Sequence, residues 1–280
     1  MPVQKEIDLP SIYKNEFLYV WFGAMHTRID LLLSGNKEKQ LKDVASQIAS
    51  EITRLEKVGS YFDPESELSL LNRMAYGEPV SISRDLFQML TLCKTFYEIT
   101  GNLFDISIRS DKHHPQTLES LILEQSSQSA RFNEKGIRLD LSGFLKGFAL
   151  DKIRKILEIH SVSNALINLG NSSILGLGNH PNGDGWKIQL ASSEAGSKSY
   201  TLHNECYTTS GNETSGRKHI LNPRTGAWLE EKKTVSVITH SGSRGEALST
   251  ALSLIEREEQ EQIVSRVQEQ YPAEFITILH

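Results

Sequence analysis

Helical and extended segments alternate along this chain of 280 residues without a regular β-α-β repeat. The clearest helical pattern runs from Lys37 to Gly59, where apolar residues recur at steps of three and four and so share one face. Arg84 to Thr100 has the same pattern, and Gly147 to His160 and Gly242 to Ile255 are further predicted helices. Since the chain has no internal repeat, low-complexity tract or linker, we expect a single α+β domain over residues 1–280, with mixed or antiparallel sheets and packed helices.

The predicted strands are short runs of β-favouring residues bounded by turn signals. Phe17 to Leu33 is predicted to be an opening hairpin or one long strand, because it ends at the turn sequence Ser34-Gly35-Asn36. After a loop from Ser60, a short helical run is expected to end near Asn72, and the polar stretch from Ser110 to Ser129 is expected to be a surface excursion. Further strands are predicted at Gly136 to Leu141, Asn164 to Leu169, Trp186 to Ala191, Thr234 to Thr239 and Phe275 to Leu279.

Charge and cysteine content exclude several classes of protein. The formal net charge is −5 and no basic stripe is present, which argues against nucleic-acid binding. Cys93 and Cys206 lie far apart in unlike contexts, so we interpret both as packing thiols and expect no disulfide framework or Cys-rich zinc site.

The N-terminal region carries no recognisable membrane signal. The first ten residues lack the basic start, apolar run and cleavage site of a secretory signal. The apolar stretch from Phe17 to Leu33 is interrupted by Arg28 and Asp30, and it is shorter than the roughly 20 residues that a membrane span needs. We therefore expect a cytoplasmic protein with no membrane span.

The segment from Asp140 to Gly147 is predicted to lie where a strand gives way to a helix. Exposed backbone N–H groups and the helix dipole favour an anion at such a place. Lys146 would put a positive charge beside a phosphoryl oxygen, and Asp140 would accept hydrogen bonds from a ribose or adenine. In the alternative interpretation, Asp140 and Ser142 only cap the start of the helix.

A later segment combines an imidazole with small hydroxyls. Thr208 to Asn212 precedes Lys218 to Gly226, in which His219 is followed by a Pro-Arg-Thr-Gly turn. His219 is a candidate base or hydrogen-bond donor near neutral pH. A lone histidine is also common as a structural hydrogen-bonding residue, so the segment alone leaves both roles open.

Glu246, Ser249 and Thr250 stand at positions i, i+3 and i+4 of a predicted helix and therefore share one face. One carboxylate with two hydroxyls suits Mg²⁺, which keeps several waters and takes only one or two carboxylates together with substrate phosphates. The alternative is that these residues only cap the start of the helix.

Together these segments resemble the ApbE family of FAD:protein FMN transferases over about residues 17–279. The most specific match is Ser60 to Asn72, which resembles the family pattern S-x-Y-x-P-x-S-E-[IL]-x-x-[LF]-N. The other matching segments follow in family order: Phe22 to Met25, Gly101 to Asp105, Asp140 to Asp151, Ala165 to Asn171, Thr209 to Asn212, His219 to Gly226 and Gly245 to Ala251.

The resemblance implies a set of ligands and an activity. Such an enzyme is expected to bind FAD and Mg²⁺, move FMN onto a Thr or Ser hydroxyl of an acceptor protein, and release AMP. Tyr61 would lie against the isoalloxazine ring, and Lys146 and His219 would act on the phosphates. The implied FAD contacts are Phe22, Tyr61, Leu103, Phe104, Asp105, Asp140, Lys146 and Leu221, and the implied metal site is Gly143, Glu246, Ser249 and Thr250.

This chain departs from the family pattern at four positions. Glu246 replaces the family's metal-binding Asp, Asn222 replaces an Asp, Ser142 replaces a Gly, and Phe22 replaces the opening Met. Glu remains a hard oxygen ligand, so metal binding is expected to survive with altered geometry. Two alternatives stay open: a non-catalytic FAD-binding paralog, and an FAD pyrophosphatase that gives FMN and AMP. Family members are often exported and membrane-anchored, which would change the expected location.

Overall fold

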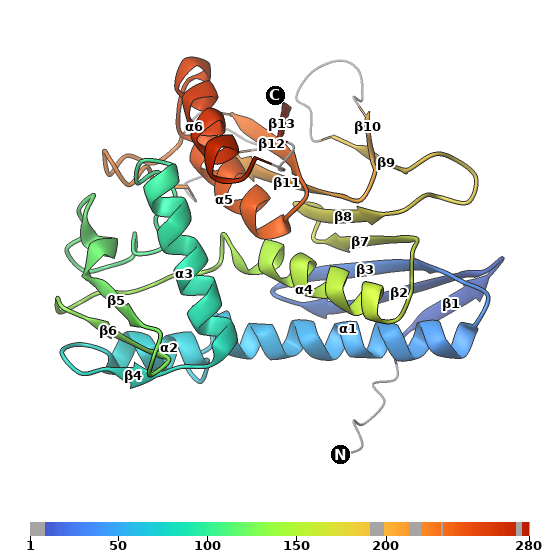
Figure 1. Cartoon of the computed structure of the whole chain (residues 1–280), viewed down its shortest axis with the longest axis horizontal. Helices are drawn as coiled ribbons and strands as arrows, with labels where there is room; N and C mark the ends of the chain where they lie inside the picture. Colours follow the sequence, from blue (N-terminus) through green and yellow to red (C-terminus); the bar gives the residue numbers. More distant parts are fainter. Residues whose placement is uncertain (1–8, 191–198, 213–219, 231, 273–275, 280) are drawn as a thin grey trace.

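A computed structural model describes residues 9–190, 199–212, 220–230, 232–272 and 276–279 (Figure 1). Within these ranges the main feature is an eight-stranded sheet in the order β1-β2-β3-β7-β8-β11-β12-β13, with every neighbouring pair antiparallel. Its strands are β1 (Ser11–Lys14), β2 (Phe17–Ala24), β3 (Thr27–Ser34), β7 (Ala165–Leu169), β8 (Ser173–Leu177), β11 (Glu205–Gly211), β12 (Thr234–Thr239) and β13 (Thr277–Leu279).

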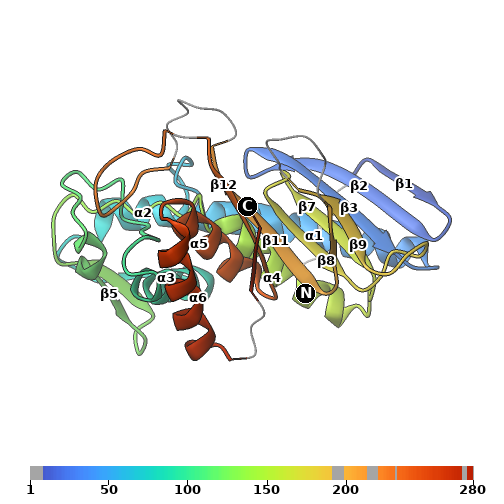
Figure 2. The same cartoon turned by 90° about the horizontal axis from the view of Figure 1, so that it is seen from above.

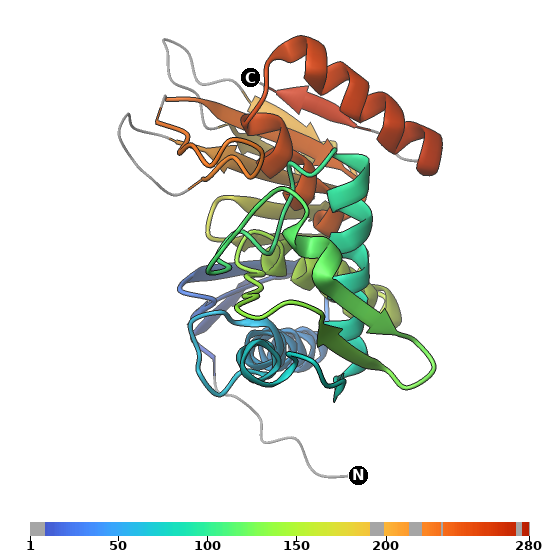
Figure 3. The same cartoon turned by 90° about the vertical axis from the view of Figure 1, so that its left-hand side faces the viewer.

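Two smaller antiparallel sheets accompany the large one. The pair β9 (Trp186–Gln189) and β10 (Ser199–Leu202) lies against β8 and β11. The set β4 (Val80–Ser81), β6 (Ser129–Phe132) and β5 (Leu121–Glu124) lies at the far end of the molecule from β1, and Figure 3 shows this end facing the viewer.

Helices cover one face of the large sheet (Figures 1 and 2). α1 packs on β2 and β3, α5 packs on β11 and β12, and α4 lies between α1 and α5. The helices are α1 (Glu38–Gly59), α2 (Glu67–Met74), α3 (Arg84–Ile99), α4 (Leu145–Ile159), α5 (Gly242–Ser253), α6 (Arg257–Gln270) and the 3₁₀ turn η1 (Thr117–Ser120). Among these helices, none has the length and apolar character that crossing a membrane requires.

The sheet separates two apolar clusters. Alternate residues of the first hairpin, such as Leu18, Val20 and Leu31, are fully or almost fully buried against the helices, as the two-residue period of a strand requires. On the opposite face, Trp186 and Tyr207 belong to a smaller cluster under β9 and β10. Because helices cover one face and a small sheet covers the other, the central strands β8 and β11 are buried on both sides.

The opening hairpin and the long amphipathic helices are confirmed. Met25 and His26 form the two-residue turn between β2 and β3, both with positive φ, which is the backbone that the strand twist favours in a tight hairpin. The apolar positions of α1 predicted from their spacing are all buried. Cys93 and Cys206 are both buried and unbridged, as expected of packing thiols.

Two expectations for the middle of the chain are wrong. Residues Gly136 to Leu141 do not form a strand. The backbone of Leu139 is paired with a side chain instead of a neighbouring strand: Asn72 Nδ2 donates to Leu139 O and Leu139 N donates to Asn72 Oδ1, each at 2.9 Å. The stretch Ser110 to Ser129 is not only a surface excursion, since it contains η1 and β5. Its residue Leu121 is fully buried and pairs with Phe132 of β6.

The remaining helices and strands follow the sequence with shifts at their ends and some omissions. α4 begins at Leu145, two residues before the predicted start, and β9 ends at Gln189. The last strand is described from Thr277, while Phe275 lies outside the described residues. The sequence patterns did not predict β1, β4, β5, β6, β8, β10, β11 or α6.

Candidate functional site

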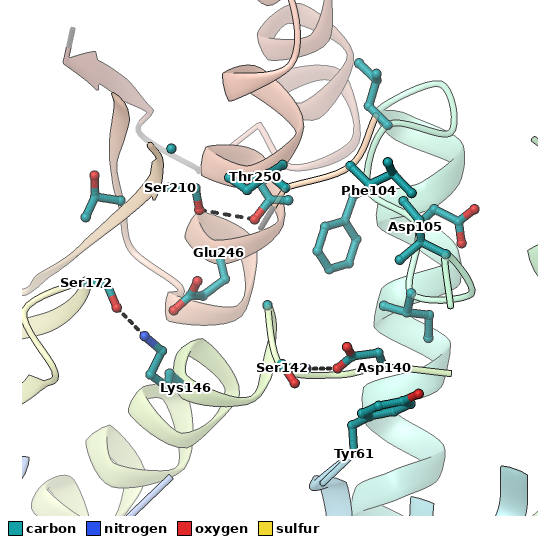
Figure 4. Close-up of a pocket in the computed structure, with 18 of the residues that line it drawn as sticks. Tyr61, Phe104, Asp105, Asp140, Ser142, Lys146, Ser172, Ser210, Glu246 and Thr250 are labelled. Carbon is teal, nitrogen blue, oxygen red and sulfur yellow. Dashed lines mark hydrogen bonds between the residues drawn. The ribbon is translucent and has the colours of Figure 1, made fainter. Parts of the chain in front are cut away.

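A cleft of about 760 Å³ lies between the start of α4, the first turns of α5 and the segment 103–109 (Figure 4). β11 and the segment 220–228 complete its walls. The cleft therefore brings together parts of the chain that are far apart in sequence. Most residues assigned by the family resemblance line it: Tyr61, Leu103, Phe104, Asp105, Asp140, Gly143, Lys146, Leu221, Glu246 and Thr250.

Small residues allow α5 to carry Glu246 into this cleft. A Cβ added to Gly245 would lie 2.6 Å from Thr208 Oγ1, so α5 approaches β11 more closely than a larger side chain permits. A Cβ added to Gly147 would lie 2.2 Å from the carbonyl oxygen of Gly242, so α4 and α5 also meet backbone to backbone. Glu246 is consequently held at the cleft wall with only 4% of its surface exposed.

The surroundings of Glu246 raise the pKa of its carboxyl group above the ordinary value. Burial raises the pKa of Glu246, while the Lys146 ammonium and a hydrogen bond donated by Ser173 Oγ to Glu246 Oε1 lower it. A cation entering the cleft beside Glu246 would favour the ionised carboxylate for the same electrostatic reason.

Hydroxyl groups surround the next turn of α5. Ser210 Oγ, from β11, shares hydrogen bonds with Ser249 Oγ at 3.0 Å and with Thr250 Oγ1 at 3.2 Å. On the opposite side, a Cβ added to Gly143 would lie 4.0 Å from Thr250 Oγ1, so the Gly143 backbone faces the same hydroxyl. Glu246, Thr250 and the turn before α4 therefore form one corner of the cleft, which we call the oxygen corner.

The oxygen corner has the donor chemistry of a magnesium site. Among the described residues, no group of three or more His, Cys, Asp or Glu side chains is placed to hold a metal ion. The corner offers one buried carboxylate together with hydroxyl oxygens, which are hard donors. This sparse set fits Mg²⁺, which completes its shell with water and substrate phosphate oxygens, better than it fits a metal that prefers nitrogen or sulfur.

Lys146 lies in the first turn of α4, beside the oxygen corner. Its ammonium donates a hydrogen bond to Ser172 Oγ, and its charge acts on the carboxylate of Glu246. Figure 4 shows Lys146 and Glu246 on the same side of the cleft. A positive charge beside the corner can pair with a phosphoryl oxygen there.

Asp140 stabilises the turn that leads into α4 rather than capping the helix. Its Oδ1 accepts a hydrogen bond from Ser142 N at 2.8 Å, and its Oδ2 accepts one from Arg109 Nε at 2.5 Å. The residue at the helix N-cap is Phe144, which makes no side-chain cap hydrogen bond. The simple capping interpretation of Asp140 and Ser142 is therefore wrong.

Asp105 holds its own loop in place. Its carboxylate is fully buried, accepts hydrogen bonds from Ser107 N and Ser107 Oγ at 2.7 and 2.6 Å, and pairs with His113 Nε2 at 2.8 Å. These contacts shape the loop that carries Phe104 and Arg109 into the cleft. Thr100 begins the same loop, since its Oγ1 accepts a hydrogen bond from Phe104 N at 3.0 Å.

Tyr61 lies at the other end of the cleft, close to Asp140 in Figure 4. The guanidinium carbon of Arg109 is 5.0 Å from the centre of the Tyr61 ring, and Phe62 meets the same ring edge-on at 5.4 Å. Asp63 and Ser66 set the loop that presents Tyr61, because Asp63 Oδ1 accepts from Glu65 N and Ser66 Oγ caps α2 through Ser69 N. An aromatic ring so placed can stack on a planar ligand.

The first turn of α5 is held by Asp151, the last residue of the motif that starts at Asp140. Asp151 Oδ1 accepts from Gly242 N at 2.7 Å, and Oδ2 accepts from Ser243 N at 3.0 Å and from Ser241 Oγ at 2.9 Å. Asp151 thus fixes the helix that carries Glu246 onto the helix that carries Lys146.

Leu221 reaches the cleft from a turn that is fastened to the neighbouring helices. Asn222 Oδ1 accepts a hydrogen bond from Arg224 N at 2.9 Å, which is a turn-forming contact that Asp could also make. Arg224 Nε donates to Gly101 O at 2.9 Å, and its NH1 pairs with Glu259 at 2.5 Å. The change from Asp to Asn at position 222 therefore preserves the local turn.

Two of the predicted site residues, Phe22 and Ser249, are not among the described residues that line the cleft, and a third lies outside the described part of the chain. Phe22 is half-buried on β2 and packs against the main core. Ser249 is fully buried just behind the cleft wall, where it contacts Ser210. His219 lies outside the described residues, so its role stays a prediction.

Sequence patterns missed several groups that line or support the cleft. Ser172 lies just before β8, Ser173 begins β8 and Ser210 lies within β11. Of these three residues, only Ser210 stands in a motif that carries the family resemblance. Arg109 immediately precedes the polar stretch interpreted as a surface excursion, and nothing in its local spacing connects it with Tyr61. Their roles depend on long-range contacts that local spacing does not reveal.

The sequence matches one protein family and individual proteins that are similar over most of their length. The ApbE family profile matches residues 25–275. An FAD:protein FMN transferase of Chlamydia muridarum is 29% identical, with 79% of this chain and 78% of the relative covered, and one of Klebsiella pneumoniae is 27% identical, with 75% and 74% covered.

Solved structures show the same fold. The flavin transferase ApbE of Vibrio cholerae has a TM-score of 0.80 at 18% identity, over 96% of this chain and 93% of that chain. The ApbE protein of Thermotoga maritima has a TM-score of 0.76 at 18% identity, over 94% of each chain. The profile match covers most of the sequence and the α+β fold agrees, and the chain therefore belongs to the ApbE family.

Proposed function

We propose that this protein is a Mg²⁺-dependent FAD:protein FMN transferase that uses FAD as its substrate. The observation that carries the proposal is the placement of a buried carboxylate, Glu246, in the same cleft as Lys146 and Tyr61. The names of the relatives from Chlamydia muridarum and Klebsiella pneumoniae support the choice of reaction.

In the proposed complex, FAD spans the cleft from Tyr61 to the oxygen corner. Tyr61 stacks on the isoalloxazine ring. Lys146, beside Glu246, pairs with an oxygen of the diphosphate. The apolar residues Leu103, Phe104 and Leu221 shield the ligand from water along the cleft walls.

The reaction is a phosphoryl transfer. The acceptor hydroxyl oxygen forms a bond to the phosphorus of the FMN half, and the bond from that phosphorus to the bridging oxygen breaks. AMP leaves with the bridging oxygen, and the hydroxyl proton passes to a base, for which His219 is the proposed residue. Mg²⁺ held by Glu246, Thr250 and the Gly143 carbonyl would neutralise negative charge on the diphosphate. Ser249 is buried behind these groups and would support Thr250 through Ser210.

The residues of this chain mainly position the reacting groups. Asp151 holds α5 in place on α4, which fixes Glu246 with respect to Lys146. Because positioning can supply several orders of magnitude in rate, small displacements of α5 are expected to lower turnover strongly. The acceptor is a protein with a Thr or Ser hydroxyl that reaches the diphosphate.

AMP release from FAD tests this proposal. AMP is measured by chromatography with Mg²⁺ and with EDTA, in the parent and in the variants Glu246→Gln and Glu246→Asp. The parent is expected to release AMP only with the metal, and Glu246→Gln is expected to lose this activity while its thermal stability changes little. Glu246→Asp keeps the charge and is expected to retain metal-dependent turnover.

Two results would reject parts of the proposal. Metal-independent AMP release, or full activity of Glu246→Gln, would remove Glu246 from the metal site. FAD binding without AMP release under any divalent metal would show instead a non-catalytic flavin-binding protein.

A further inference from the structure

Arg109 lies beside Tyr61 in the cleft, and only part of its hydrogen-bonding capacity is satisfied by the protein. Its guanidinium carbon is 5.0 Å from the centre of the Tyr61 ring and 6.0 Å from that of Phe62. Its Nε donates to Asp140 Oδ2 at 2.5 Å. An aromatic face and a carboxylate therefore fix one side of a planar, permanently charged group.

The remaining donors of Arg109 are available to a ligand. Among the described residues, none accepts a hydrogen bond from its two terminal guanidinium nitrogens. The side chain is 48% exposed, and the residue lines the cleft. A guanidinium that is already oriented loses little further rotamer freedom when it binds a ligand.

The position of Arg109 indicates which part of FAD it would contact. Within the described lining of the cleft, Lys146 and Arg109 are the two cationic side chains. Lys146 lies beside Glu246, at the oxygen corner where the diphosphate is proposed to bind. Arg109 lies against Tyr61, at the end proposed for the isoalloxazine ring, whose pyrimidine edge carries carbonyl and ring-nitrogen acceptors.

We propose that Arg109 is a specificity-determining residue that donates hydrogen bonds to the acceptor edge of the flavin ring bound against Tyr61. This proposal rests on the proposed function, and it adds recognition of the ring to the recognition of the diphosphate. Arg109 selects ligands with a flavin ring, whereas Lys146 and the oxygen corner select those with a diphosphate.

Calorimetry with three ligands separates these contributions. FAD, riboflavin and ADP, each with Mg²⁺, are titrated into the parent and Arg109→Met. Affinity for FAD and for riboflavin is expected to fall about tenfold, because both carry the ring, and affinity for ADP is expected to stay the same. Retained ADP binding also shows that the variant is folded.

Arg138→Met is the matched control. Arg138 pairs with Asp111 at 3.0 Å, has a similarly exposed side chain and is not among the residues that line the cleft. Its removal is expected to leave the affinity for all three ligands unchanged. An equal loss of flavin affinity in Arg138→Met would show a general effect of surface charge and overturn the assignment.

A double-variant cycle with Asp140→Asn excludes an indirect effect through Asp140. If Arg109 acted only by holding Asp140, Arg109→Met would change nothing in the Asp140→Asn background. The proposal predicts that the loss of riboflavin affinity persists there.

Three outcomes distinguish the possible failures. Loss of ADP affinity without loss of riboflavin affinity would overturn the assignment to the ring and place Arg109 at the diphosphate. Unchanged affinity for all ligands in Arg109→Met would show that Arg109 is no ligand contact. A parent protein that does not bind FAD at all would refute the proposed function as well.

Discussion

Replacing Gly147 by Ala tests whether α4 and α5 meet as closely as the site requires. The added Cβ would lie 2.2 Å from the carbonyl oxygen of Gly242 and 2.6 Å from Cγ of Glu246. The first of these atoms belongs to the backbone and cannot move away by changing a rotamer. The two helices must therefore separate, or α5 must shift, to accommodate one methyl group.

Two opposing contributions decide how much Gly147→Ala changes the free energy of unfolding. Ala is favoured over Gly in a helix interior by about 1 kcal/mol. Overpacking a tight contact costs about 1–3 kcal/mol, and a backbone contact belongs at the upper end of that range. We expect a net loss of about 1–2 kcal/mol in the free energy of unfolding. Since Glu246 is displaced as well, metal-dependent AMP release is expected to fall by about a hundredfold.

Urea denaturation and the AMP assay measure the two effects of Gly147→Ala separately. Gly183→Ala is the control, because nothing lies within 4 Å of a Cβ added there. The Gly147 variant is expected to lower the transition midpoint with an unchanged slope, and the control is expected to leave AMP release unaltered. A Gly147 variant as stable and as active as the parent would refute the close approach of the two helices.

Three further predictions concern other parts of the molecule. Tyr61→Ala is expected to lose about 1–3 kcal/mol of flavin binding free energy, measured by calorimetry. Tyr61→Phe is expected to keep most of this binding free energy because the ring remains, and unchanged binding in Tyr61→Ala would rule out stacking. Asp151→Ala is expected to lower the free energy of unfolding by about 2 kcal/mol and to weaken Mn²⁺ binding measured by electron paramagnetic resonance, and unaltered Mn²⁺ affinity would separate Asp151 from the metal site. Burial raises the pKa of Asp85, but hydrogen bonds from Lys152 and Arg54 outweigh it and lower the pKa overall, so the Asp85 carboxylate stabilises the fold above its unfolded pKa. Asp85→Asn is accordingly expected to be less stable than the parent at pH 7, with a difference that shrinks as the pH falls below about 3.9; a difference independent of pH would contradict this ion pair.

Local sequence patterns predicted the helices and strands that bury one apolar face in the main core. The spacing from Leu41 to Leu55 marks a single buried face of α1, and the turn at Ser34-Gly35-Asn36 marks the end of the first hairpin. By contrast, Leu121 belongs to β5, a strand of only four residues that stands in a polar stretch and pairs with the next strand, β6. A strand this short carries too little periodicity to be recognised from the local pattern.

The candidate site divides in the same way. The order of motifs along the sequence predicts that Tyr61, Asp140 and Glu246 share one site, and the structure places all three around one cleft. Local spacing could not connect Ser173 with Glu246 or Arg109 with Tyr61, since these contacts depend on how the sheet, α5 and the loop after α3 pack together.

The products of FAD cleavage test the proposed reaction most directly. The protein is incubated with FAD, Mg²⁺ and a Thr-containing acceptor protein, AMP is measured by chromatography, and FMN covalently bound to the acceptor is measured by intact-protein mass spectrometry. A transferase that uses the oxygen corner is expected to give AMP and acceptor-bound FMN in equal amounts, with both abolished by EDTA and in Glu246→Gln. AMP accompanied only by free FMN would show a pyrophosphatase, and the absence of AMP in every metal would contradict catalysis by this cleft.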